Sequence, residues 1–232
     1  MRHIVLDTET TGIGAELGHR LIEVGCVELV DRKLTGNHFH TYLNPQRDVD
    51  EGAFRVHGIS TEFLQDKSLF NEIAEQLLQF IDGAELIIHN APFDVGFLNA
   101  ELRRAHWPKA LQDYCPILDT LVLARDKHPG QRNSLDALCK RYDVDNSNRQ
   151  LHGALLDAEL LAFVYLAMTG GQTNLFIDDD LATSHAQTHS NVFPEALSSG
   201  SPVNVATVDE LARHNEFVAF LVKKSGINHW QD

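Results

Sequence analysis

The first residues that could do chemistry are Asp7 and Glu9, which follow the apolar run at residues 4–6. Side chains two positions apart on a β-strand lie on the same face, so the two carboxylates are expected to project together. Neighbouring carboxylates repel each other unless they are protonated or neutralised by cations such as Mg²⁺. The pair is therefore a candidate metal site, although a D-x-E pattern alone is more often a solvated surface.

A second candidate is Asp94, which ends the segment HNAPFD at residues 89–94. This segment follows an apolar strand-like run and opens a helical pattern that includes Phe97 and Leu98. Asp94 is thus predicted to lie in the first turn of a helix. An acidic residue there can simply cap the helix, because the helix dipole stabilises it by about 0.3–1 kcal/mol.

The third candidate pair is His152 and Asp157, which are separated by a five-residue step. On one regular helix such a step would set the two side chains about 140° apart. They can converge only if Gly153 breaks the backbone, so that His152 lies on a loop and Asp157 lies in the first turns of the helix. Taken alone, such a pair is more often structural than catalytic.

Strands and helices must alternate to bring these segments together. Runs rich in β-branched and aromatic residues predict strands, the first three as a meander, at residues 2–9, 22–30, 38–43, 85–89 and 116–118. Apolar residues at helical spacing predict helices around residues 73–81, 93–102, 135–142 and 155–168. Asp119 is expected to cap one helix and Asn133-Ser134 another, and Gly170-Gly171 is expected to end the last one. The pattern predicts an α/β fold, in which helices flank a mixed sheet.

The composition changes after this region. Residues 178–202 are polar and lack apolar periodicity, which predicts a flexible linker. Periodicity returns at residues 207–225, where Val208, Leu211 and Phe217 belong to one amphipathic helix. A single helix cannot bury its own apolar face, so it is expected to dock on another protein or to fold back on the parent domain.

The 232 residues carry a formal net charge of −14, with 43% hydrophobic and 22% charged residues. No apolar stretch approaches the roughly 20 residues of a bilayer span, and no secretory signal is recognisable, so a cytoplasmic protein without membrane association is expected. Cys26, Cys115 and Cys139 are expected to be reduced core thiols. The acidic charge argues against autonomous nucleic-acid binding, so any such affinity must come from bound metal ions or from a partner.

In chain order the three segments form the pattern D-x-E, N-x-x-x-D and H-x-x-x-x-D, which resembles the DEDDh 3′→5′ exonucleases. The longer strings VLDTETTG, IIHNAPFD and LHGALLDAELLA are similar to the epsilon (proofreading) subunit family of bacterial DNA polymerase III. This resemblance implies a ribonuclease-H-like fold with a mixed five-stranded sheet flanked by helices. It further implies removal of mispaired 3′ DNA ends as nucleoside 5′-monophosphates.

The resemblance also assigns roles to single residues. It implies that two Mg²⁺ or Mn²⁺ ions are held by four carboxylates, Asp7, Glu9, Asp94 and Asp157. It makes His152 the general base that takes a proton from the attacking water. Contacts to the terminal nucleotide are implied for Thr8, His57 and Phe93, together with Asp7, Glu9 and Asp157. Because these groups do not read bases, selectivity is expected to come from the easier fraying of a mispaired end.

Partners follow from the same resemblance. Gln172, Leu175 and Phe176 fit the Q-x-x-L-F peptide that docks replication proteins on the sliding clamp. The resemblance implies that the C-terminal helix binds the polymerase (alpha) subunit and that single-stranded or frayed 3′ DNA ends are substrates. It also raises a small theta-like accessory subunit, whose presence the sequence leaves open. The expected divisions are an exonuclease domain at residues 1–171, a clamp peptide and linker at 172–206, and a docking helix at 207–232.

Three alternatives remain open at this point. An RNA-trimming exonuclease of the same superfamily would share every catalytic residue, but it should lack the clamp peptide and the tethered helix. A scaffold without catalysis would have no reason to keep all five catalytic residues. A calcium-binding or interaction surface made of the acidic clusters would leave the linker and the helix unexplained.

Overall fold

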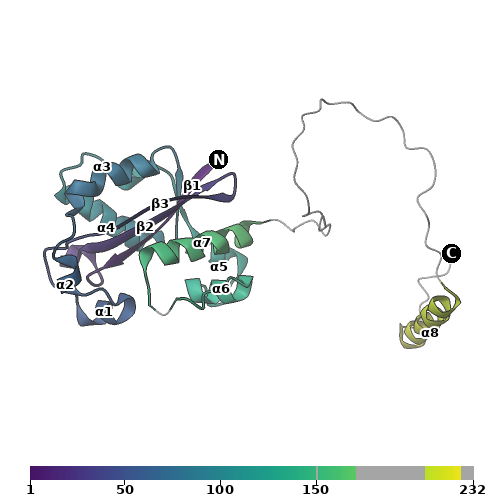
Figure 1. Ribbon diagram of the computed structural model, residues 1–232. Helices are drawn as coiled ribbons and strands as arrows, with labels where there is room; N and C mark the ends of the chain where they lie inside the picture. The colour runs from purple at the N-terminus through teal and green to yellow at the C-terminus, as the bar shows by residue number, and fades with distance from the viewer. Residues whose placement is uncertain (150, 171–206, 226–232) are drawn as a thin grey trace, which may run out of the picture. The chain divides into compact units, whose positions relative to one another are not determined.

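The computed structural model describes residues 1–149, 151–170 and 207–225 (Figure 1). The chain divides into two units, Met1–Ile177 and Asp178–Asp232. The first unit is built on a five-stranded sheet with the order β3-β2-β1-β4-β5. Its strands are β1 (Arg2–Thr10), β2 (Leu21–Val30), β3 (Lys33–Tyr42), β4 (Glu85–Ile88) and β5 (Ile117–Asp119). The first three strands form the predicted antiparallel meander, and β4 and β5 add in parallel, so the sheet is mixed.

Helices cover both faces of this sheet (Figure 1). One layer contains α3 and α4, and the other contains α5, α6 and α7. The helices of the unit are α1 (Glu51–His57), α2 (Thr61–Leu64), α3 (Phe70–Ile81), α4 (Ala91–Arg104), α5 (Thr120–Lys127), α6 (Leu135–Tyr142) and α7 (Ala154–Thr169), with short 3-10 turns at Ala15–Leu17 and Leu111–Asp113. The predicted α/β fold is confirmed.

The two faces of β1 belong to different cores. Ile4 and Leu6 pack in the apolar cluster that contains α3 and α4, whereas Val5 packs in the cluster that contains α6 and α7. Because side chains alternate along a strand, Asp7 continues the α7 face, and Thr8 continues the α4 face. The end of β1 therefore presents polar groups to both helical layers.

Gly25 on β2 allows α7 to approach the sheet closely. It is the register partner of Asp7. A Cβ atom at this position would lie 2.3 Å from the backbone of Ala154 and Leu155. No side chain fits there, so the glycine places the first turn of α7 directly over the strand that pairs with Asp7.

Gly25→Ala is expected to lower the free energy of unfolding by about 1–3 kcal/mol, because an added methyl group must push α7 away from the sheet. Urea denaturation followed by circular dichroism measures this change. Gly52→Ala is the matched control, since nothing lies within 4 Å of a Cβ added at this helical position. Equal stability of the two variants would contradict the close packing described for Gly25.

Some elements differ from the sequence prediction. Strand β3 begins at Lys33 rather than at residue 38, and α1 and α2 were not predicted. Asp119 and Ser134 cap α5 and α6 as expected, and α7 ends at Thr169 with Gly170 as its cap. In the second unit, helix α8 (Val208–Ser225) agrees with the helix predicted at residues 207–225. Within the described ranges, no helix is both long and apolar enough to cross a bilayer.

Candidate active site

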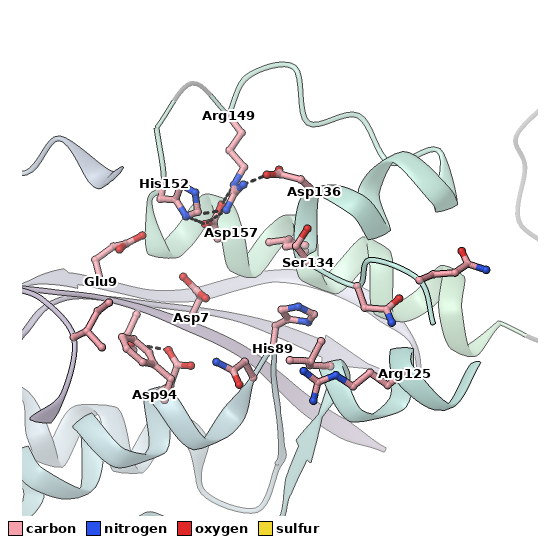
Figure 2. A pocket seen from close by; sticks show the side chains of 18 residues that line it. Asp7, Glu9, His89, Asp94, Arg125, Ser134, Asp136, Arg149, His152 and Asp157 are labelled. Atoms are coloured by element: carbon pink, nitrogen blue, oxygen red, sulfur yellow. Dashed lines mark hydrogen bonds and ion pairs between the residues drawn. The ribbon is translucent and has the colours of Figure 1, made fainter. Parts of the chain in front are cut away.

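A groove of about 790 Å³ runs along the end of β1 (Figure 2). All four predicted metal ligands line it: Asp7 and Glu9 from β1, Asp94 from α4 and Asp157 from α7. His152 lines it as well, from the loop before α7. The three sequence segments, which lie between residues 7 and 157 of the chain, therefore meet in one groove.

Asp94 is held in place by a sharp turn between β4 and α4. Asn90 adopts the left-handed conformation with φ 63°, which Asn tolerates better than most residues, and α4 begins immediately after it. Asp94 lies buried in the first turn of this helix, as predicted. The Thr8 hydroxyl donates a hydrogen bond of 2.6 Å to Asp94 Oδ1. This contact ties the α4 carboxylate to β1.

His152 and Asp157 converge because α7 begins between them. Gly153 is the extended N-cap residue of α7, and Asp157 lies in the first turn. His152 stays on the loop, where its backbone N–H donates to the carbonyl of Val56 at 3.1 Å. One ligand atom each of Glu9, His152 and Asp157 lies within 4.8 Å of the other two. The predicted break at Gly153 is confirmed.

Arg149 was not predicted, yet its guanidinium contacts three other side chains of the groove. Its Nε and Nη2 atoms donate to Asp157 Oδ1 and Oδ2 at 2.5 and 2.7 Å. Nη2 also donates to His152 Nδ1 at 2.9 Å, and Nη1 donates to Asp136 Oδ1 at 2.7 Å. Figure 2 shows the guanidinium between these three side chains.

The pKa values of the four carboxyl groups are shifted in different directions. Burial and repulsion from Asp94 and Glu9 raise the pKa of Asp7 well above its usual value. Burial and repulsion from Asp157 raise the pKa of Glu9 to about 8, and burial raises the pKa of Asp94 to about 7. Burial also acts to raise the pKa of Asp157, but the hydrogen bonds and charge of Arg149 outweigh it, with a contribution from His152, and hold this pKa below its usual value.

This donor set fits hard divalent cations. Carboxylate oxygens are the ligands that Mg²⁺ and Mn²⁺ prefer, and three of the four carboxylates have raised pKa values, which means that their charged forms lack compensation. Positive charge at the groove would restore the charged forms. Among the four carboxylates, a direct ion pair with a described Arg or Lys is seen for Asp157 alone.

Comparison of the sequence with known proteins shows the family of this chain. A sequence profile described as Exonuclease matches residues 4–165. The DNA polymerase III subunit epsilon of Pasteurella multocida is 51% identical over 97% of this chain and 90% of its own length. That of Escherichia coli K12 is 50% identical over 99% of this chain and 97% of its own length. This chain belongs to the DNA polymerase III epsilon subunit family. It is a 3′→5′ proofreading exonuclease.

The fold of this epsilon-family chain also occurs in solved exonuclease structures. Exonuclease X in complex with 5′ overhanging duplex DNA superposes with a TM-score of 0.56 at 25% identity, over 72% of this chain and 90% of that one. A 3′-exonuclease bound to a histone mRNA stem-loop superposes with a TM-score of 0.62 at 16% identity, over 72% of this chain and 63% of that one. The second likeness concerns the fold alone.

The substrate contacts predicted for the epsilon family lie in two different places. Thr8 and Phe93 line the groove beside the carboxylates. His57 is buried outside the groove lining, at the end of α1, where its Nδ1 accepts from the backbone N–H of Ile59 at 3.0 Å. Sequence reasoning missed further lining residues beyond the carboxylates: His89, Arg125, Gln131, Asn133, Ser134 and Asp136. Gln172, Leu175 and Phe176 of the predicted clamp peptide lie outside the described residues.

The raised pKa of Glu9 gives this epsilon-family domain a pH-dependent stability. Its ordinary value is 4.5 and the folded value is about 8, so the native state binds more protons than the unfolded chain between these limits. Stability must then fall as pH rises through that window. With EDTA present, the Glu9 contribution is expected to fall by on the order of a few kcal/mol, since each pKa unit corresponds to about 1.4 kcal/mol.

Urea denaturation at pH 5.5 and pH 8 measures this difference against Glu9→Gln, which removes the titrating group and leaves the other groups in place. The wild type should lose more stability than Glu9→Gln over this interval, and Mg²⁺ should remove the difference. An identical pH dependence of the two proteins in EDTA would show that Glu9 does not titrate as described.

Proposed function

We propose that this chain removes 3′-terminal nucleotides from DNA by two-metal-ion hydrolysis and releases nucleoside 5′-monophosphates. The observation that carries the proposal is the convergence of Asp7, Glu9, Asp94 and Asp157 in one groove beside His152. Three of these carboxylates lack a compensating charge, as their raised pKa values indicate. Two divalent cations, Mg²⁺ or Mn²⁺, match this excess of negative charge.

The residues of the groove would have different roles in the hydrolysis. Bound cations would supply positive charge that neutralises the phosphodiester and its leaving oxygen. The four carboxylates would hold these ions, with Asp7 in the central position on β1 and Thr8 fixing the Asp94 carboxylate. His152, half-exposed at the mouth of the groove, would take the proton from the attacking water.

The groove supports a selection of DNA ends that separate easily from the template strand, and not a selection of particular bases. Beside the carboxylates it offers the Phe93 ring for stacking and the polar side chains of Asn90 and Thr8, none of which forms a base-specific pattern. A mispaired terminus separates at lower cost than a paired one, so it enters such a site more often. Equal digestion rates for matched and mismatched ends would contradict this part of the proposal.

The second unit supports attachment to a partner protein. In helix α8, Val208 is 84% exposed and Leu211 is 48% exposed, which leaves apolar surface available. We assign this surface to the polymerase (alpha) subunit, and the Q-x-x-L-F peptide at residues 172–176 to the sliding clamp. Tethering would also explain the net charge of −14, because a high effective concentration replaces electrostatic affinity for DNA. A cytoplasmic location completes the assignment, and the presence of a theta-like accessory subunit stays open.

The proposal is tested by incubating the full chain with a 3′-labelled primer that is paired or mispaired at its end, with Mg²⁺, Mn²⁺ or EDTA. RNA of the same sequence is run in parallel. Release of single deoxynucleoside 5′-monophosphates, faster at the mispair and absent in EDTA, is expected. Rapid trimming of RNA without hydrolysis of DNA would overturn the assigned substrate and leave the catalytic groups standing.

A further inference from the structure

Arg149 engages the same atoms that a metal ion would need. Its two hydrogen bonds to Asp157 are parallel and use both carboxylate oxygens. Such bidentate, charge-assisted pairs are the strong ones among protein hydrogen bonds. Both side chains are largely shielded from solvent, with 7% of Arg149 and 4% of Asp157 exposed. Water therefore weakens this pair much less than an exposed ion pair.

The same guanidinium also engages the candidate base. Arg149 Nη2 lies 2.9 Å from His152 Nδ1, and a guanidinium can only donate hydrogen bonds. Nδ1 must therefore be the acceptor, so its lone pair is occupied. His152 Nδ1 also lies 3.4 Å from Asp157 Oδ2, which makes it the ring nitrogen that faces the carboxylate. While this contact lasts, that nitrogen cannot accept a proton from water.

We propose that Arg149 is a positioning residue that competes with a divalent cation for Asp157 and releases both Asp157 and His152 when the cation binds. The reason is electrostatic, since two positive groups cannot share the same carboxylate oxygens at hydrogen-bonding distance without repulsion. This inference rests on the proposed function, in which Asp157 is a metal ligand. It assigns to Arg149 control over the affinity of one cation site.

The surroundings of Arg149 favour such an exchange. Arg149 lies on the segment between α6 and α7, outside regular secondary structure, and its Nη1 atom holds a second carboxylate, Asp136. Asp136 is 60% exposed and comes from α6, at the outer side of the groove (Figure 2). After release from Asp157 the guanidinium keeps this partner, and the cation compensates Asp157. Neither carboxylate is left buried without a positive neighbour, which would be costly.

The test is a calorimetric titration of Mn²⁺ into the full chain and into Arg149→Gln. The variant is expected to bind a cation about tenfold more tightly, which corresponds to about 1.4 kcal/mol. Arg125→Gln is the matched control, because Arg125 lines the same groove but acts on His89 instead of Asp157. Its affinity should change by less than about twofold, as expected for a more distant charge screened by solvent.

Asp136→Asn provides a second variant at an exposed position, where the fold is not at risk. It removes the partner that the guanidinium keeps after its release, so displacement of Arg149 becomes less favourable and the Mn²⁺ affinity should fall slightly. Arg149→Lys keeps the charge but cannot form the bidentate pair, and its affinity should lie between those of the wild type and Arg149→Gln.

Asp157→Asn distinguishes a failure of the proposed function from a failure of the role assigned to Arg149. If Asp157→Asn binds as much Mn²⁺ as the wild type, Asp157 is not a ligand and the proposed function fails at this residue. If Asp157→Asn loses a cation while Arg149→Gln binds Mn²⁺ no more tightly than the wild type, the competition assigned to Arg149 is overturned.

Discussion

Asp7→Asn is expected to reduce hydrolysis of a 3′-labelled primer by at least about a thousandfold, since a single group that stabilises transition-state charge contributes about 10²–10³-fold and Asp7 serves the whole cluster. Its carboxylate lies on β1 among the three other carboxylates, whose charges act on its pKa together with burial. Asparagine keeps the shape and removes the charge. The loss should therefore appear in metal binding as well as in the rate.

Two measurements separate this effect from unfolding. Calorimetric Mn²⁺ titration should show a lost or strongly weakened site in Asp7→Asn, whereas circular dichroism should show the wild-type fold. Asp126→Asn is the matched control, because Asp126 is an exposed carboxylate on α5 and its loss should leave the rate unchanged. Retention of more than about a tenth of the wild-type rate by Asp7→Asn would remove Asp7 from the centre of the proposed mechanism, because it would fall short of the loss expected for such a group.

His152→Ala is expected to lower the hydrolysis rate by about 10²–10⁴-fold, the usual contribution of a positioned general base. Cation binding should be retained, because the four carboxylates remain. The loop position of His152 makes the substitution safe for the fold, since the ring is half-exposed and α7 begins only after Gly153. Single-turnover hydrolysis at saturating Mg²⁺ gives the rate, and Mn²⁺ titration gives the binding.

His38→Ala serves as the control for the loss of an imidazole, because His38 is exposed on β3 away from the groove. It should hydrolyse the primer at the wild-type rate. Unchanged turnover in His152→Ala would assign the proton transfer to another group, and loss of cation binding in that variant would make His152 a ligand in place of a base.

Much of the site could be predicted because each carboxylate follows a strong local signal. Asp7 and Glu9 follow the apolar run at residues 4–6 within β1, and Asp94 lies just after a strand-to-helix turn. His152 and Asp157 flank a glycine that sets the start of a helix. Each of these signals comes from residues that are neighbours in the sequence, so it can be recognised without knowledge of the fold. The convergence of the segments follows from their common position at the end of β1.

Other features depend on long-range contacts and left no such signal. Arg149 reaches Asp157 through a long side chain from an irregular segment, so no periodicity marks it. Gly25 lies in the largely buried strand β2, and the approach of α7 explains why a glycine is needed there. The first half of β3 is exposed on both faces at the edge of the sheet, so it shows no apolar alternation that could have marked its start at Lys33.

Helix α7 is the last described element of the first unit, and this position has a consequence for biosynthesis. A chain leaving the ribosome presents Asp7 early, but Asp157 and His152 emerge only after every strand of the sheet. Helix α7 must then pack against Gly25 before the four carboxylates can come together. Unfinished chains thus lack part of the proposed site, and we expect nascent fragments without α7 not to hydrolyse nucleic acids.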